Sequence, residues 1–190
     1  MLILASSSPR RRELLDLLGV DYRPVPMELD EAILQDEKPE EAVLRLANAK
    51  AEAATRRHPG VWVIGADTVV ALGGRILGKP ADAADAEGML AGLSGTVHAV
   101  HTGIALVHSN HQGYSVATKA EVRFRELSAT EIQDYVATGE PMGKAGAYAV
   151  QGIGGTLVDR IEGELSTIVG LTLSATARLL TRAGISHGMA

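Results

Sequence analysis

The pattern of apolar and polar residues along this chain predicts strands and helices that alternate. The apolar start over 1–5 predicts a buried strand, and a leucine-rich segment over 9–18 predicts a short helix that Gly19 ends. The longest helical pattern covers about 39–57, where apolar residues recur at intervals of three and four. This first third therefore favours alternating strands and helices.

The same alternation continues to the end of the chain. We expect further strands over 22–25, 61–72, 96–108, 115–125 and 156–163, and further helices over 81–93, 128–138 and 171–183. A Gly-rich loop over 139–155 precedes the last strand. Because no repeat or linker interrupts the pattern, we expect one mixed α/β domain over 1–190.

Composition excludes several classes of protein. The 190 residues are 46% hydrophobic and 22% charged with a net charge of -5, which is typical of soluble globular proteins. The apolar runs are too short to span a bilayer, and the start lacks the basic residues of a signal peptide, so we expect a cytoplasmic protein. The acidic balance, with one Phe, one Trp and four Tyr, argues against nucleic-acid binding. The absence of cysteine excludes disulfides, thiolate metal sites and cysteine nucleophiles.

The helix over 9–18 begins with three arginines, which is unusual for a first turn. Ser8 is a favoured N-cap and Pro9 suits the first helical position. Basic residues there cost roughly a few tenths of a kcal/mol unless an anion binds, because free N–H groups and the macrodipole make that end electropositive. The hydroxyls of 6–8 fit phosphate binding better than nucleophilic catalysis, since no His and Asp partners can be assigned. The segment therefore predicts a polyphosphate site.

Two phosphate-loop patterns are incomplete. Residues 73–79 match the Walker A spacing as far as Lys79, but Pro80 replaces the hydroxyl residue that would hold Mg²⁺. Residues 152–155 begin like a dinucleotide fingerprint, yet they lack the final glycine and the strand–turn–helix context. Lys79 can still meet a phosphate as a single positive charge.

Carboxylates in two segments are candidate metal ligands. Asp67 follows the apolar run VWVIGA, in which Gly65 leaves room for another group to approach the strand. A buried carboxylate at this position destabilises the fold unless it is paired, bound to a metal or at the solvent-exposed end of the sheet. The alternative to a functional role is a strand-end carboxylate that is hydrogen-bonded to a turn. A second acidic cluster lies in the expected loop after Pro26: Glu28, Asp30 and Glu31. Such groups with phosphate oxygens suit Mg²⁺ or Mn²⁺, although each of the three also fits solvated surface charge.

The two histidines in the segment HAVHTG do not suit a shared metal. His98 and His101 are three residues apart in an expected strand, so their side chains point to opposite faces. We expect structural or surface histidines.

Several ordered motifs resemble the Maf family of nucleotide pyrophosphatases along nearly the whole chain. They are SSSPRRRELL, LDE, RLANAKA, GADTVV, LGKP, LSGTVHAVHTG, FRELSATEI and KAGAYAVQGIGG. The resemblance implies an elongated α/β fold related to the inosine-triphosphate pyrophosphatases, with two lobes around a central cleft, and usually a homodimer. It also implies hydrolysis of a nucleoside triphosphate to the monophosphate and pyrophosphate with a divalent cation.

The resemblance also assigns roles to single residues. Ser8, Arg11, Lys50 and Lys79 would bind the triphosphate, while Glu31 and Asp67 would serve the metal and the attacking water. Asp67 corresponds to the family's proposed general base. A free carboxylate has a pKa of about 4 and is a poor base at neutral pH, so Asp67 can instead orient the water or ligate the metal. Both roles stay open at this point.

Substrate choice in the family follows three positions, which are occupied here by Arg10, Thr68 and Gln151. They resemble the branch that acts on dTTP, UTP and some modified uridine triphosphates, and the glutamine amide can both donate to and accept from a pyrimidine edge. Two alternatives are the 7-methyl-GTP branch and a nucleotide-binding regulator of cell division. Removal of noncanonical nucleotides is an expectation from the family. Arg12 is expected to be a solvated surface charge.

Two positions depart from the family pattern. Gly143 stands where an acidic residue usually precedes KAG, so one charge beside the site is missing. Thr172 stands where proline is usual, and we expect that change to affect only the start of a helix.

Overall fold

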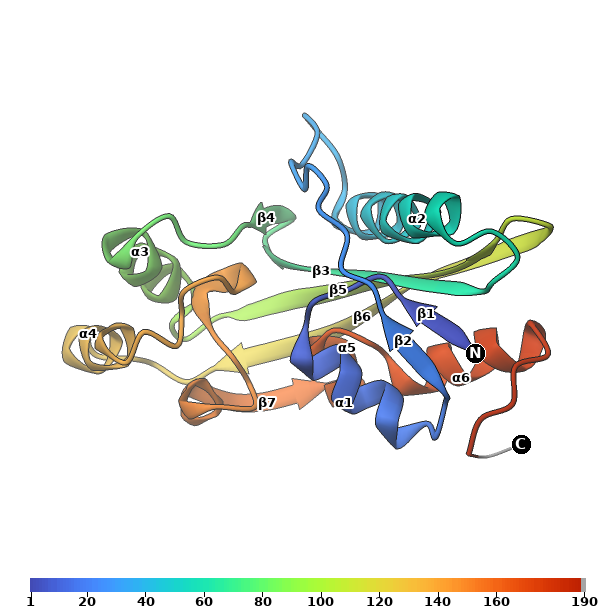
Figure 1. Cartoon of the computed structure of the whole chain (residues 1–190). Helices are drawn as coiled ribbons and strands as arrows, with labels where there is room; N and C mark the ends of the chain where they lie inside the picture. Colours follow the sequence, from blue (N-terminus) through green and yellow to red (C-terminus); the bar gives the residue numbers. More distant parts are fainter. Residues whose placement is uncertain (189–190) are drawn as a thin grey trace.

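A seven-stranded mixed sheet runs through residues 1–188, the part of the chain that the computed structural model describes (Figure 1). The strand order is β2-β1-β3-β5-β6-β7, and β4 pairs with β3 outside this path. β1 is parallel to both β2 and β3, whereas the other pairs are antiparallel. The strands are β1 (Leu2–Leu4), β2 (Tyr22–Pro24), β3 (Val63–Leu72), β4 (Arg75–Leu77), β5 (Val97–His108), β6 (His111–Phe124) and β7 (Val158–Glu162).

The helices match the hydrophobic pattern closely. They are α1 (Pro9–Leu17), α2 (Pro39–Arg57), α3 (Ala83–Leu93), α4 (Ala129–Ala137), α5 (Leu165–Val169) and α6 (Leu173–Arg182), with 3₁₀ helices η1 (Ala145–Ala147) and η2 (Ile153–Leu157) in the Gly-rich segment. The expected mixed α/β class is therefore confirmed. The pattern missed β4 and α5, because three and five residues are too few for a period to show.

α2 covers one face of the sheet, over β3 and β5 (Figure 1). Its backbone comes very close to the strands because the positions beneath it are glycines. A Cβ on Gly65 would collide with the Ala47 carbonyl of α2, and one on Gly103 would collide with the Val43 carbonyl. The group that approaches the strand at Gly65 is therefore this helix.

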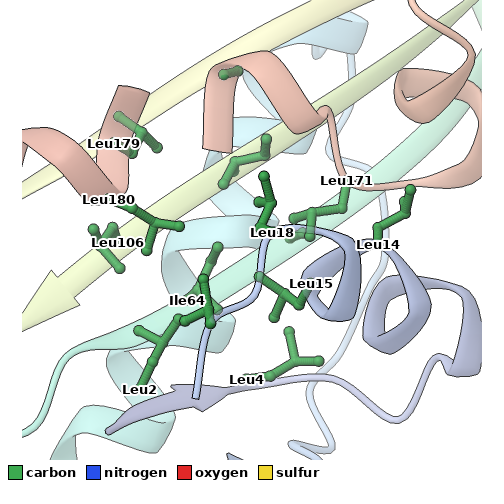
Figure 2. Packing of buried hydrophobic residues seen from close by; sticks show 14 of the residues in the cluster. Leu2, Leu4, Leu14, Leu15, Leu18, Ile64, Leu106, Leu171, Leu179 and Leu180 are labelled. Atoms are coloured by element: carbon green, nitrogen blue, oxygen red, sulfur yellow. The ribbon is translucent and has the colours of Figure 1, made fainter. Parts of the chain in front are cut away.

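Two clusters of buried hydrophobic residues lie at opposite ends of an elongated molecule. The first joins β1, α1 and α6 through residues such as Leu4, Leu15 and Leu180 (Figure 2). The second includes Leu90 of α3 and Phe124 of β6 and lies at the other end, where Figure 1 shows α3 and α4. β3 runs through both clusters. This arrangement agrees with the two lobes expected from the family.

The edge of β3 is open between these two ends. β1 pairs with β3 at Val63 and Ile64, and β4 pairs with it over 70–72. Among the described residues, 66–69 therefore have a strand partner only in β5. Side chains from both faces of β3 can reach the gap, and the candidate site lies there.

Candidate active site

A cavity of about 650 Å³ lies at the open edge of β3. This volume falls within the usual range for small-molecule sites. Residues from α1, α2, β3, the loop before α2 and the segment after β4 line it. Eight of the residues that the sequence predicted for the site are among them: Ser8, Arg10, Arg11, Glu31, Lys50, Asp67, Thr68 and Lys79. Gln151 is exposed and is not among the described residues that line the cavity, although Val150 is.

The N-terminus of α1 borders this cavity. The Ser8 hydroxyl caps the helix by accepting from the Arg11 backbone N–H at 3.5 Å, and Pro9 is the first helical residue, as the sequence predicted. The Ser6 hydroxyl accepts from the Ser8 backbone N–H at 3.2 Å. The chain after β1 is thus held as a turn of hydroxyls and N–H groups, which suits an anion.

Arg11 joins three elements around the cavity. Its Nε donates to the Gly170 carbonyl at 2.9 Å, Nη1 donates to the Ser6 hydroxyl at 3.3 Å, and Nη2 donates to the Thr68 hydroxyl at 3.4 Å. Burial lowers the pKa of Arg11, while the charges of Asp67 and Glu31 raise it. A guanidinium has five N–H donors and stays protonated in proteins, so two donors remain for an anionic ligand.

Four charged side chains form a continuous chain of ion pairs. Lys50 Nζ lies 2.6 Å from Asp67 Oδ1 and 2.6 Å from Glu31 Oε1, and Lys79 Nζ lies 2.8 Å from Glu31 Oε2. Lys50 and Asp67 are buried, whereas Lys79 and Glu31 are exposed. Burial raises the pKa of Glu31, but its bonds to Lys50 and Lys79 outweigh this and lower the pKa to about 2. Both carboxylates therefore meet one ammonium group.

The donor set of this cluster suits a divalent cation with few protein ligands. Within residues 1–188, no group of three or more His, Cys, Asp or Glu side chains is arranged as a complete metal site. Glu31 and Asp67 nevertheless contact a common atom, Lys50 Nζ, so the two carboxylates are near enough to share one cation, a position that the ammonium group holds in this structure. Mg²⁺ commonly takes one or two carboxylates and completes its shell with water and substrate phosphates. The carboxylate pair therefore fits such an ion only together with a phosphorylated substrate.

Asp67 and Thr68 reach the cavity from opposite faces of β3. Asp67 shares the face covered by α2 with Gly65, and Thr68 shares the other face with Ile64. Successive strand residues alternate in this way, and both reach the cavity because no neighbouring strand covers this edge in the described chain. Asp67 lies inside β3 and accepts a hydrogen bond from Lys50 of α2. The alternative interpretation, a strand-end carboxylate bonded to a turn, is therefore wrong.

The Gly-rich segment supplies cavity residues that the sequence analysis did not name. Lys144 and Tyr148 line the cavity, and the motif KAGAY was the available signal for both. Gly143 also lines it, so the missing family charge belongs to a position at the site. Glu140 holds the segment by accepting from the Tyr135 hydroxyl at 2.8 Å and from the N–H groups of Ile153 and Gly154 at 3.0 and 2.8 Å.

The remaining candidates from the sequence are His98, the Walker-like segment and Arg12. His98 is buried and bonds the Tyr148 hydroxyl through Nε2 at 2.9 Å, and burial lowers its pKa to about 4. Residues 73–74 form the turn of the β3–β4 hairpin, and α3 begins only at Ala83, so the Walker-like pattern is not a phosphate loop. Arg12 is exposed, as expected for a surface charge.

The expectation for Thr172 was right about its place, the N-cap position of α6, but wrong that only the start of the helix is affected. Its side chain does not cap α6; the buried hydroxyl instead contacts the hydroxyls of Thr118 at 2.6 Å and Thr167 at 2.9 Å. The change from proline therefore adds a polar contact between β6 and the segment before α6.

Comparison with known proteins identifies the family of this chain. The family described as Maf-like protein matches residues 1–183. The chain belongs to the Maf family. Curated Maf relatives named dTTP/UTP pyrophosphatase include one from Myxococcus xanthus, 49% identical over 97% of this chain and 93% of the relative. Another, from Anaeromyxobacter sp., is 51% identical over 96% of this chain and 89% of the relative.

Solved structures give weaker matches to this Maf protein. The Staphylococcus aureus Ham1 protein matches with a TM-score of 0.47 and 17% identity, over 65% of this chain and 71% of that one. A nucleoside-triphosphatase / dITP/XTP pyrophosphatase from Mycobacterium abscessus matches with a TM-score of 0.45 and 18% identity, over 96% of each chain. The family assignment therefore rests on the sequence matches. None of the helices described here has the length and apolar character needed to cross a membrane.

Proposed function

We propose that this Maf protein hydrolyses dTTP and UTP, and modified pyrimidine triphosphates, to the nucleoside monophosphate and pyrophosphate. The observation that carries the proposal is that buried Asp67 and Lys50 meet Glu31, Lys79 and the N-terminus of α1 in one cavity. The names of the curated relatives, dTTP/UTP pyrophosphatase, support this substrate class. We propose removal of noncanonical nucleotides as the physiological role of this activity.

The cations of the cavity are suited to the triphosphate. Lys79, Arg10 and the two unused donors of Arg11 surround the cavity together with the capped start of α1. Helix N-termini and charged donors are the common protein partners of phosphate oxygens. The arginines at the start of α1 are tolerable because a bound polyphosphate supplies the opposite charge.

Glu31 and Asp67 would hold a divalent cation, Mg²⁺ or Mn²⁺, which would supply Lewis acidity beside the phosphates. Lys50 fixes the Asp67 carboxylate at the cavity through its 2.6 Å contact. Asp67 is then placed to accept a hydrogen bond from the attacking water and to orient it. As the water oxygen forms the new bond to phosphorus, the α–β anhydride bond breaks, the proton of the water passes to the Asp67 carboxylate and from there to solvent, and pyrophosphate leaves.

A panel of triphosphates tests this proposal. The panel contains dTTP, UTP, CTP, GTP, 7-methyl-GTP and modified uridine triphosphates with Mg²⁺ or Mn²⁺, and pyrophosphate release is measured. We expect dTTP and UTP to be the preferred substrates. Pyrophosphate release in the absence of both metals, or turnover of 7-methyl-GTP alone, would contradict the assignment. No turnover of any triphosphate would favour the alternative of a nucleotide-binding regulator of cell division.

The variant Asp67→Asn tests the role of the carboxylate. We expect turnover to fall by about 100-fold or more while nucleotide binding stays measurable, since removal of a group that handles the water's proton has effects of this size. Asp159→Asn is the matched control, because Asp159 is exposed and lies near Arg123 on the surface. Near-normal turnover in Asp67→Asn would remove this residue from the mechanism.

We further propose that the chain is a single functional unit and works as a cytoplasmic homodimer. These proposals rest on the family resemblance and on the uninterrupted sequence pattern. Sedimentation at several protein concentrations measures the assembly state.

A further inference from the structure

Five buried or half-buried threonines connect the cavity to the interior on the face of the sheet opposite α2. They come from three strands and the segment before α6, and they are Thr68, Thr102, Thr118, Thr167 and Thr172. Thr68 and Thr102 are direct cross-strand partners in β3 and β5, and their hydroxyl oxygens are 2.8 Å apart. Thr68 lines the cavity, but the reaction as proposed gives no role to the other four.

Counting protons fixes the direction of the bond between Thr68 and Thr102. The Thr102 hydroxyl lies 2.7 Å from the Thr167 carbonyl oxygen, which can only accept. A hydroxyl has a single proton, and Thr102 donates its proton to that carbonyl. The short contact to Thr68 is then a hydrogen bond only if Thr68 donates and Thr102 accepts.

A second branch of the network has a fixed direction for the same reason. Thr118 donates to the Thr102 carbonyl at 3.1 Å, so Thr172 must donate to the Thr118 hydroxyl. Thr167 must in turn donate to the Thr172 hydroxyl. These bonds fasten the segment that carries the Thr167 carbonyl to β6 and thus hold the acceptor of Thr102 in place.

The consequence for the cavity is that Thr68 has no proton to offer a ligand. Its oxygen accepts from Arg11 Nη2 at 3.4 Å, and one lone pair remains. The non-bridging oxygens of a metal-bound triphosphate carry no proton near neutral pH and cannot donate to it. A group of the ligand that bonds Thr68 directly is therefore an N–H or O–H donor, and in a nucleoside triphosphate the nucleoside supplies such donors.

We propose that Thr102 is a positioning residue that makes Thr68 a pure hydrogen-bond acceptor, and thereby directs Thr68 to a donor on the nucleoside and not to the triphosphate. The inference rests on the proposed function. dTTP and UTP share two such donors: the N3–H of the base, in whose place cytosine has an acceptor, and the 3′-hydroxyl of the sugar, which CTP also has. Discrimination of uracil from cytosine follows in the first case only.

Binding of non-hydrolysable nucleotides tests the inference independently of turnover. We would measure Kd values for UTP, CTP, N3-methyl-UTP, 3′-deoxy-UTP and 3′-O-methyl-UTP with a methylene group between the α and β phosphates, and for inorganic tripolyphosphate. The proteins are the wild type, Thr102→Val and Thr102→Ser. Thr55→Val is the matched control, because buried Thr55 also donates to a backbone carbonyl, that of Ala51, but lies on α2, outside the threonine network.

In the wild type we expect either N3-methylation or 3′-deoxygenation to weaken binding, and the modification that does so identifies the donor. In Thr102→Val the freed Thr68 proton can be donated to an acceptor, so the preference for UTP over CTP should shrink by about tenfold if N3–H is the donor, and the preference for UTP over 3′-O-methyl-UTP should shrink by about tenfold if the 3′-hydroxyl is the donor. Thr102→Ser should restore that preference, and tripolyphosphate affinity should not change. Weakening by neither modification in the wild type, an unchanged preference in Thr102→Val, or an equal loss of tripolyphosphate affinity would overturn the inference. Wild-type binding without pyrophosphate release would refute only the proposed activity.

Discussion

Replacement of Lys50 by methionine tests whether the buried ion pair holds the site together. Lys50 is 6% exposed and Asp67 is 8% exposed, so Lys50→Met leaves a buried carboxylate without its ammonium partner. Removing one partner of such a pair costs about 3–5 kcal/mol. We expect the free energy of unfolding to fall by about 3 kcal/mol, the low end of this range, because Glu31 is exposed and keeps its ion pair with Lys79. In a chain of this length that loss lowers Tm by roughly 6–12 °C.

Lys79→Met is the matched control for this experiment. The Lys79 side chain is 59% exposed and pairs only with Glu31 among the acidic residues described. Exposed ion pairs contribute about 0–1 kcal/mol, so the control should lose far less stability. The double variant Lys50→Met with Asp67→Asn should recover part of the loss, because no unpaired buried charge remains.

Urea denaturation at pH 7 and thermal melting measure these differences. At this pH Glu31 remains charged in the folded protein, since its lysine partners lower its pKa to about 2. Equal stability of Lys50→Met and Lys79→Met would show that burial of the pair does not matter. A double variant no more stable than Lys50→Met would refute the argument about unpaired charge.

Two further substitutions test the framework of the site. Gly103→Ala would push against the Val43 carbonyl and should cost about 1–3 kcal/mol in urea denaturation, whereas Gly113→Ala, with no atom nearer than 3.4 Å to the added Cβ, should cost much less. Burial raises the pKa of Glu140, but the hydrogen bonds from the Gly154 N–H and the Tyr135 hydroxyl outweigh it, so the folded-state pKa lies below the ordinary value of a glutamate. Glu140→Gln should therefore lose about 1–2 kcal/mol at pH 7, and the loss should shrink at pH 3; a difference independent of pH would contradict this.

Local sequence determined the order and type of nearly all the helices and strands. Periodicity sufficed for α2, whose observed bounds of Pro39–Arg57 are those the pattern predicted. Short-range chemistry also placed the start of α1, because the Ser8 cap and Pro9 act within one turn of the helix. The sequence marked Lys79 and Asp67 as candidate groups by their neighbours in the chain.

Tertiary structure decided how those groups meet. Lys50 lies on the buried face of α2, and it reaches Asp67 only because Gly65 and Gly103 let that helix settle onto β3 and β5. The cavity itself exists because the partners of β3 stop short of each other, a matter of register between distant segments.

The polarity of Thr68 is the clearest case of what only the fold supplies. Nothing in the sequence around Thr68 indicates whether its hydroxyl donates or accepts. Pairing with Thr102 and the approach of the Thr167 carbonyl, from almost a hundred residues away, decide it. Sequence fixes which hydrogen-bonding groups a protein has, but packing between distant segments determines which of their protons remain for a ligand.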